Sequence, residues 1–364
     1  MRHLVLFLIS FLSLTACNSG SKQQVEGERV ADSSSQAVEN ATLTADDRGP
    51  SITLDAPVML SYRMKVGDTF GYKIEDRQDI LLMQDTIANH NVQNLTWWYH
   101  FEVLEANPGG AARLRATCDR VLFDGRYDGP GGKRSMKYDS DEKNTYDLDK
   151  QYAQYNAPVH TPFVIVVEQS GRIADITELT EVIRNFMKDD FRTTKSNQIN
   201  AIAKDYADQN LKGTLQIVFQ KLSEAPVGKD STWMISTPDR LGYLAMQNSA
   251  TYKVRDVVES PLGRVAHVDV TLTKTYVGKK KVDTGDGMAT MSEFEARGKG
   301  STVFNIDKGA LQRRRLRNTV KVRMWVEPPD ELKQMTKGTP QEVHDFWWTL
   351  NGITENVIEP YLRP

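Results

Sequence analysis

From Val58 onward, short segments in which apolar and polar residues alternate are separated by turn residues, and this period of two predicts antiparallel β-strands joined by short hairpins. The same order of landmarks occurs twice. Residues 66–68 and 227–229 each precede an aromatic strand, a strand that begins with tyrosine, a hairpin with glycine, and a further strand–turn–strand. We favour an internal duplication of roughly 160 residues. The alternative is that hairpins resemble one another in all such proteins.

Between the two series, apolar residues follow the helical spacing i, i+3, i+4, i+7 from Leu179 to Met187. Asp175 and Glu178 offer a capping pair before this stripe. Two further apolar stripes lie in residues 199–206 and 211–222. The segment therefore predicts helices that cover a sheet.

The C-terminal residues carry the clearest helix signals in the chain. Thr339 is the expected N-cap, Pro340 suits the first helical position, and Glu342 completes a capping box. One helical face then carries the apolar residues Val343, Phe346, Trp347, Leu350, Ile353, Val357, Ile358 and Tyr361. We predict a helix packed on the sheet. The alternative, a membrane-surface helix, usually has Lys or Arg on its polar face, where this segment has Glu and Asp.

These elements predict an α+β fold, with two related antiparallel β-sheet units, a helical insert between them and a C-terminal helix packed on the sheet. Whether the two units form one sheet or two stays open. The expected organisation is a signal peptide with Cys17 (1–17), a disordered tether (18–55), the first β unit (56–176), a helical segment (177–225), the second β unit (226–327), and a linker with the C-terminal helix (328–364).

The N-terminus has the pattern of an export signal. A basic start precedes an apolar run from Leu4 to Leu14, which is shorter than the ~20 residues that a membrane-spanning helix needs. Leu14-Thr15-Ala16-Cys17 then resembles the lipobox of bacterial lipoproteins, which implies a lipid on Cys17 and attachment to a membrane of the bacterial envelope. The alternative is an ordinary secretory signal with a coincidental cysteine. Asn18 and Ser19 favour the outer over the inner membrane.

Composition adds limits to this picture. Residues 18–55 are polar and poor in aromatic side chains, which is typical of a tether. The formal net charge of -2 gives no indication of nucleic-acid binding. Cys118 is the only cysteine besides Cys17 and lies on the apolar face of a predicted strand, so we expect a buried side chain without a disulfide.

Several turn motifs resemble a family of uncharacterised bacterial secreted proteins and lipoproteins, a domain of unknown function. They are residues 60–63 with 66–68, residues 138–141, residues 162–163 with 171–173, and residues 225–233. The resemblance spans about 58 to 327 and implies curved antiparallel sheets partly wrapped around helices. Because the motifs are turns and strand starts, no catalytic residue follows from them.

The search for reactive or ligand-binding residues finds no recognisable catalytic, metal or cofactor motif. The histidines lack the spacing of a metal pair. The acidic residues 139–149 lack the glycine of a calcium loop and have Lys143 at a ligand position. The Gly-rich residues 125–134 have Tyr127 and Arg134 where a phosphate-binding loop needs Gly and Ser or Thr. We therefore expect no enzyme and no cofactor.

One group of residues stands out on the predicted strand from Leu311 to Glu327. Its cations share one face: Arg313, Arg315, Arg317, Lys321 and Arg323. They would repel one another unless carboxylates such as Glu293 and Glu295 on a neighbouring strand, or a ligand, neutralise them. The alternatives are a solvated ion-pair ladder and an anion-binding surface.

Three classes of function therefore remain. The first is a non-enzymatic envelope lipoprotein that binds an apolar or anionic component (lipid, lipopolysaccharide or acidic glycan) or a partner protein. The second is a structural or assembly role without a small-molecule site, and the third is a hydrolase with dispersed catalytic residues. The sequence does not indicate the oligomeric state.

Overall fold

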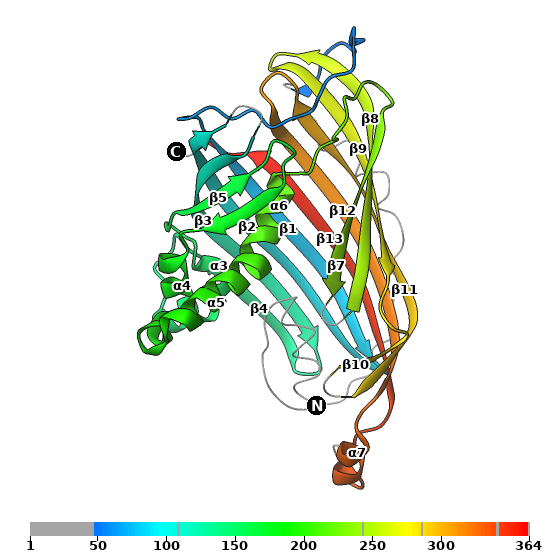
Figure 1. Cartoon of the computed structure of the whole chain (residues 1–364). Coiled ribbons are helices and arrows are strands. Elements are labelled where there is room, and N and C mark those ends of the chain that lie inside the picture. Colours follow the sequence, from blue (N-terminus) through cyan, green and yellow to red (C-terminus); the bar gives the residue numbers. More distant parts are fainter. Residues whose placement is uncertain (1–46, 108–109, 242–243, 285–286, 340–341, 363–364) are drawn as a thin grey trace.

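The computed structural model describes residues 47–107, 110–241, 244–284, 287–339 and 342–362. The chain is mostly β, with 55% strand and 18% helix, and its strands join in one antiparallel sheet of 13 strands (Figure 1). The prediction of an α+β fold with two sheet units is therefore wrong. Strands from both halves of the chain share one continuous ladder of hydrogen bonds.

The sheet has the order β6-β5-β3-β2-β1-β13-β12-β11-β9-β8-β7, while β4 pairs with β3 and β10 pairs with β11 outside this path. The strands are β1 (Thr69–Gln84), β2 (Ile87–Ala106), β3 (Ala112–Gly129), β4 (Gly132–Asp139), β5 (Phe163–Val167), β6 (Ile173–Thr177), β7 (Thr232–Leu241), β8 (Leu244–Ser260), β9 (Gly263–Tyr276), β10 (Lys281–Asp283), β11 (Met288–Asn305), β12 (Ala310–Glu327) and β13 (Phe346–Pro360). The strands β1-β2-β3-β5-β6 and β7-β8-β9-β11-β12 follow one another in the same way in the two halves. The repeated hairpins of the sequence thus appear as two stretches of one sheet.

The predicted C-terminal helix is wrong, because residues 346–360 form β13. β13 pairs with β1 on one side and with β12 on the other, and so joins the two halves of the chain. Phe346, Trp348 and Leu350 are buried on one face, so the residues that fit a helical stripe also fit strand alternation. Glu342 instead accepts from the backbone N–H of Gly338, which follows the short helix α7 (Asp330–Thr336).

Helices lie against one face of the sheet beside β1, β2 and β3 (Figure 1). They are α2 (Tyr146–Gln151), α3 (Ala153–Asn156), α4 (Thr180–Met187), η2 (Lys188–Thr193), α5 (Ser196–Tyr206), η3 (Ala207–Leu211) and α6 (Lys212–Val218). Phe219, directly after α6, packs its ring 5.3 Å from that of Phe101 and 5.8 Å from that of Tyr62. We call this helix-covered face the inner face, and the opposite face the outer face.

The inner face carries the apolar core. Its larger part lies under the helices and includes Ile74, Phe101 and Leu316. A second cluster lies further along the same face and includes Ile80, Leu82, Val322, Met324 and Leu350, against which Leu244 of β8 packs. These side chains are almost completely buried, so apolar side chains fill both parts of the interior.

The first described residues run along the sheet. Asp47 is buried and bonded to Arg313, and the backbone N–H of Ile52 donates to the carbonyl oxygen of Val257 at 2.8 Å. Part of the segment that we expected to be tether therefore contacts the sheet from residue 47 onward. The expected signal peptide and lipid-bearing Cys17 lie outside the described residues. A search of the described helices for one that could cross a membrane returned none.

Candidate functional site

The structure places the five cations of β12 on the outer face. Strand alternation positions them, because their neighbours Leu316, Val322 and Met324 point into the core. β11 and β13 flank β12, so the cations face side chains from both neighbours. On the outer face of these three strands cations outnumber carboxylates: Arg297, Lys299, Arg313, Arg315, Arg317, Lys321 and Arg323 stand against Glu293, Glu295, Glu327, Glu355 and Glu359.

Three of the five predicted cations form ion pairs. Arg313 Nε donates to Asp47 Oδ2 at 2.7 Å, and its Nη1 lies 3.6 Å from Glu359. Arg315 Nε donates to Glu355 Oε1 at 2.7 Å. Lys321 Nζ lies 2.9 Å from Glu293 Oε1, as the sequence suggested for that carboxylate. These contacts form a cross-strand ladder, which neutralises part of the cationic stripe.

The other two cations, Arg323 and Arg317, form no ion pair with a carboxylate of the described residues. Arg323 lies over the ring of Trp347, with its guanidinium carbon 4.2 Å from the ring centroid. Arg317 lies opposite Lys299 in the register of β12 and β11, and opposite Glu355 in the register of β12 and β13, where the Glu355 carboxylate is bonded to Arg315 instead. Among the described residues, neither Arg317 nor Lys299 has a carboxylate oxygen within 4.0 Å. This cationic pair is the part of the stripe that the ladder leaves without a counter-charge.

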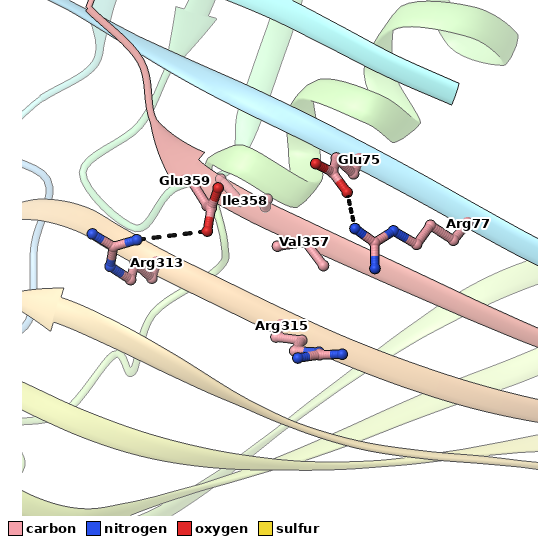
Figure 2. A pocket seen from close by; sticks show the side chains of 7 residues that line it. All are labelled: Glu75, Arg77, Arg313, Arg315, Val357, Ile358 and Glu359. Atoms are coloured by element: carbon pink, nitrogen blue, oxygen red, sulfur yellow. Dashed lines mark hydrogen bonds and ion pairs between the residues drawn. The ribbon is translucent and has the colours of Figure 1, made fainter. Parts of the chain in front are cut away.

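A cleft opens on the outer face over β1, β12 and β13, and neither Arg317 nor Lys299 lines it. It has a volume of about 160 Å³ and is lined by Glu75, Arg77, Arg313, Arg315, Val357, Ile358 and Glu359 (Figure 2). These residues come from β1, β12 and β13, which the register of β13 brings together.

The charges in the cleft are connected. Glu75 forms ion pairs with Lys73 and with Arg77, and Arg77 Nη1 lies 3.4 Å from Glu355. Burial acts to raise the pKa of Glu75, but the hydrogen bonds from Lys73 and Arg77 outweigh it and hold the pKa below its ordinary value. Glu75 is thus ionised at neutral pH. An incoming anion would therefore compete with carboxylates for Arg77, Arg313 and Arg315, whereas Arg317 and Lys299 would need no exchange of partners.

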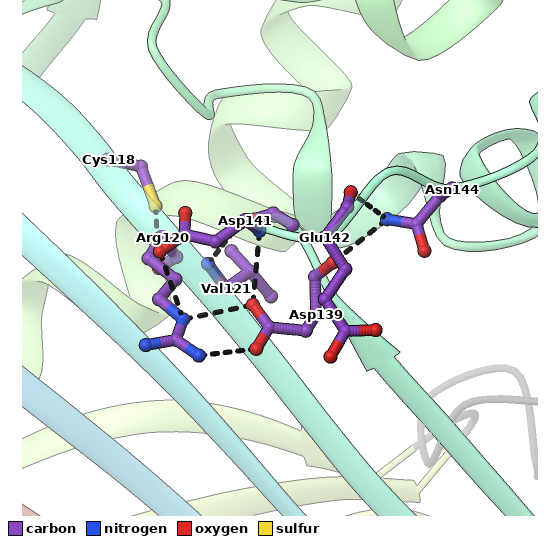
Figure 3. Close-up of polar contacts among 8 residues, drawn as sticks. Cys118, Arg120, Val121, Asp139, Asp141, Glu142 and Asn144 are labelled. Carbon is purple, nitrogen blue, oxygen red and sulfur yellow. Dashed lines mark hydrogen bonds and ion pairs between the residues drawn. The ribbon is translucent and has the colours of Figure 1, made fainter.

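The other residues singled out in the sequence have structural partners. Cys118 is buried as expected and has no disulfide, and burial raises the pKa of its thiol far above the ordinary value. Arg120 of β3 binds Asp139, with Nε 2.9 Å from Oδ1, which occupies the first carboxylate of the acidic segment (Figure 3). In the ranges that the structure describes, no three or more His, Cys, Asp or Glu are arranged to hold a metal.

The sequence did not predict the carboxylates that line the cleft, and it did not predict that Lys299 lies opposite Arg317. Glu355 and Glu359 were assigned to a helix, although their alternation with Val357 fits the outer face of a strand. Glu75 and Arg77 lie on β1, far away in the sequence, and no local signal places them beside β12. Lys299 could have been found, because it alternates with Arg297 and Glu295 on the strand that supplies Glu293.

Comparison with solved structures finds only loose likenesses. A structure of lipovitellin, described by its lipid–protein interactions, matches with a TM-score of 0.38 and 11% identity over 83% of this chain and 26% of that chain. An outer membrane channel from Pseudomonas putida F1 matches with a TM-score of 0.21 and 7% identity, over 82% of this chain and 97% of the channel. OccK7 (OpdD) of Pseudomonas aeruginosa has a TM-score of 0.19 and 5% identity, over 81% and 100%.

No curated protein matches the sequence. The model of a protein family matches residues 127–310, which run from β3 through the helices to the start of β12 and include Lys299. This match covers half of the chain, and it agrees with the resemblance to an uncharacterised family that the turn motifs carry. The chain therefore belongs to the family of unknown function DUF6263.

Proposed function

We propose that the protein is a non-enzymatic lipoprotein of the bacterial envelope, attached through Cys17 to the outer rather than the inner membrane. Its outer sheet face binds an anionic envelope component, such as a phosphate-bearing lipid, lipopolysaccharide or an acidic glycan. The Leu14-Thr15-Ala16-Cys17 sequence supports the location. The cationic face of β11 and β12 supports the binding.

The observation that carries this proposal is the direct opposition of Lys299 and Arg317. Like charges opposite each other on neighbouring strands destabilise a sheet. An anion bound between the two side chains would remove that repulsion. Guanidinium groups suit this role because their forked N–H groups bind two oxygens of a phosphate or carboxylate at once.

A structural or assembly role remains the second candidate, and the ion-pair ladder favours it. Arg313, Arg315 and Lys321 are each neutralised within the chain, as expected of a solvated sheet face. The two hypotheses differ in the role that they give to Lys299 and Arg317, the surplus cations that have no carboxylate partner among the described residues. The experiment must therefore alter one of these two residues.

The test is charge reversal at Arg317. Binding of the full chain to inorganic phosphate and to purified lipopolysaccharide is measured by titration calorimetry. Arg317→Glu should weaken both interactions roughly tenfold, because it removes one of two surplus cations and adds a carboxylate beside the other. The control is Arg192→Glu, which makes the same charge change on an exposed residue of η2. Equal affinity in the two variants would reject the proposal.

A further inference from the structure

One end of the outer face is aromatic. Trp325 of β12 lies opposite Trp347 of β13, with ring centroids 5.2 Å apart and ring planes at 64°. Arg323 covers Trp347 from the same face. Both indole rings keep part of their surface in solvent. A cation stacked on a pair of half-exposed tryptophans presents apolar rings and a guanidinium group at one place.

Apolar side chains continue this aromatic end onto β1 and β2. Leu81 and Met83 lie opposite Asn351 and Thr349 of β13, on the outer face, and both are half-buried. Val92 of β2 is 38% exposed on the same face. Asp79 and His90, whose side chains lie 2.7 Å apart, share this face with Leu81 and Val92. The aromatic and apolar side chains are therefore distributed over four neighbouring strands, from β2 to β12, with one ion pair among them.

The surplus cations lie on the same face, further along β12. Eight residues separate Arg317 from Trp325, which corresponds to about 26 Å along a strand. Lys321 and Arg323 lie between them and point the same way. The outer face thus combines a strip of Arg and Lys side chains with an amphipathic end, along one line.

The chain that leads back to Cys17 reaches the body on this face. Asp47 contacts Arg313, and its carbonyl oxygen accepts a hydrogen bond from His267 Nε2 at 2.9 Å. Val303 lies opposite both Arg313 and His267 in the sheet, which places the three residues and Asp47 on the outer side.

We infer that the occupant of this face is the surface of an anionic lipid bilayer, with lipid phosphates at Lys299 and Arg317 and with Trp325 and Trp347 at the level of the headgroups. This inference rests on the proposed function and specifies its ligand. Tryptophan rings prefer the membrane interface, and Lys and Arg are attracted to anionic headgroups. A soluble polyanion would use the cations but would leave Leu81, Met83 and Val92 without a partner.

The experiment uses the full chain and vesicles that contain brominated lipids, which quench tryptophan fluorescence on contact. Vesicles of phosphatidylcholine alone are compared with vesicles that also contain phosphatidylglycerol. We expect strong quenching only in the anionic vesicles. Replacing both tryptophans, Trp325→Phe with Trp347→Phe, should remove most of it, whereas Trp233→Phe, on β7, should not.

Charge reversal gives the second arm of this experiment. Arg317→Glu should raise the lipid concentration for half-maximal quenching roughly tenfold, and Arg192→Glu should leave it unchanged. Circular dichroism shows whether each variant is folded. Equal quenching in neutral and anionic vesicles, or none in either while inorganic phosphate still binds, would overturn the bilayer inference alone. If the unaltered chain does not bind inorganic phosphate, the proposed function is overturned as well.

Discussion

Lys299 of β11 lies directly opposite Arg317 of β12, and within the described chain neither side chain has a carboxylate oxygen closer than 4.0 Å. Two other cations of β12, by contrast, have carboxylate partners: Arg315 has Glu355 and Lys321 has Glu293. Glu355 lies opposite Arg317 on β13, but its carboxylate is bonded to Arg315, so Arg317 and Lys299 face each other as like charges.

We therefore predict opposite effects of Lys299→Glu on stability and on binding. The variant replaces a like-charge pair with an opposite-charge pair, so the free energy of unfolding should rise by about 0.5–1 kcal/mol. Phosphate binding should weaken, because the site loses a cation. Urea denaturation and titration calorimetry measure the two effects.

The control for this prediction is Lys204→Glu. Lys204 is exposed in the last turn of α5, among the helices that cover the inner face, and the substitution makes the same change in net charge. It should not change phosphate affinity. If Lys299→Glu lowered stability, or if both variants bound phosphate equally well, the interpretation of Lys299 and Arg317 as a strained binding pair would be wrong.

The contact between Asp47 and Arg313 predicts a large effect at the start of the described chain. The Asp47 side chain is 1% exposed and that of Arg313 is 19% exposed. Asp47→Asn removes the carboxylate to which Arg313 Nε donates, so the free energy of unfolding should fall by about 2–3 kcal/mol. In an Arg313→Met background the same substitution should cost less than half as much. Equal costs in the two backgrounds would show that Asp47 acts independently of Arg313.

The sequence was sufficient to predict which face of a strand or helix each side chain occupies. The period of two placed Arg313, Arg315 and Arg317 opposite Leu316 and Val322, and the structure has this alternation. The helical stripe of Val182 and Ile183 is likewise present and buried in α4. These features depend on which side of an element a residue occupies, and local spacing determines that side.

The sequence was not sufficient to predict features that depend on which strands pair with each other. Residues 346–360 fit both a helix and a strand, and the free edges of β1 and β12 settle the competition by supplying hydrogen-bond partners on both sides. The cleft depends on the same register, because Glu75, Glu355 and Arg315 come from three strands that are distant in the sequence. Local propensity contains no information on which strands become neighbours.

The ion pair of Arg120 and Asp139 predicts a pH dependence of stability. The hydrogen bond from Arg120 lowers the pKa of Asp139 below the value of ~3.9 expected in the unfolded chain. Its contribution is therefore present above pH ~4 and is lost as the pH falls through the lower, folded-state value. Arg120→Gln should reduce stability by about 1 kcal/mol at pH 7, and its difference from the unaltered protein should shrink below pH ~3.

Arg126→Gln is the matched control for this pH series. Arg126 is on the same strand, β3, and is exposed. Its stability curve between pH 2 and 7, followed by urea denaturation, should run parallel to that of the unaltered protein. A difference for Arg120→Gln that stayed constant down to pH 2 would assign its effect to another contact, such as the stacking of Arg120 on Trp98.

Substitution by alanine should have opposite effects on stability at Gly300 and at Gly213. A Cβ at Gly300 of β11 would lie 2.1 Å from the carbonyl oxygen of Arg315 and 2.8 Å from the Cα of Leu316, both backbone atoms of β12. Gly300→Ala must therefore push β11 and β12 apart, with an expected loss of at least about 2–3 kcal/mol. Gly213 in α6 has open space around it, so Gly213→Ala should add about 0.5–1 kcal/mol.

The same pair of variants tests whether binding depends on the spacing of the two strands. Gly300 lies next to Lys299, so displacement of β11 should also separate Lys299 from Arg317. Phosphate affinity should fall in folded Gly300→Ala, at a temperature where circular dichroism shows native structure, and should be unchanged in Gly213→Ala. Since Gly300 has no charge to contribute, a folded Gly300→Ala protein with unaltered affinity would mean that the two cations do not act on one anion together.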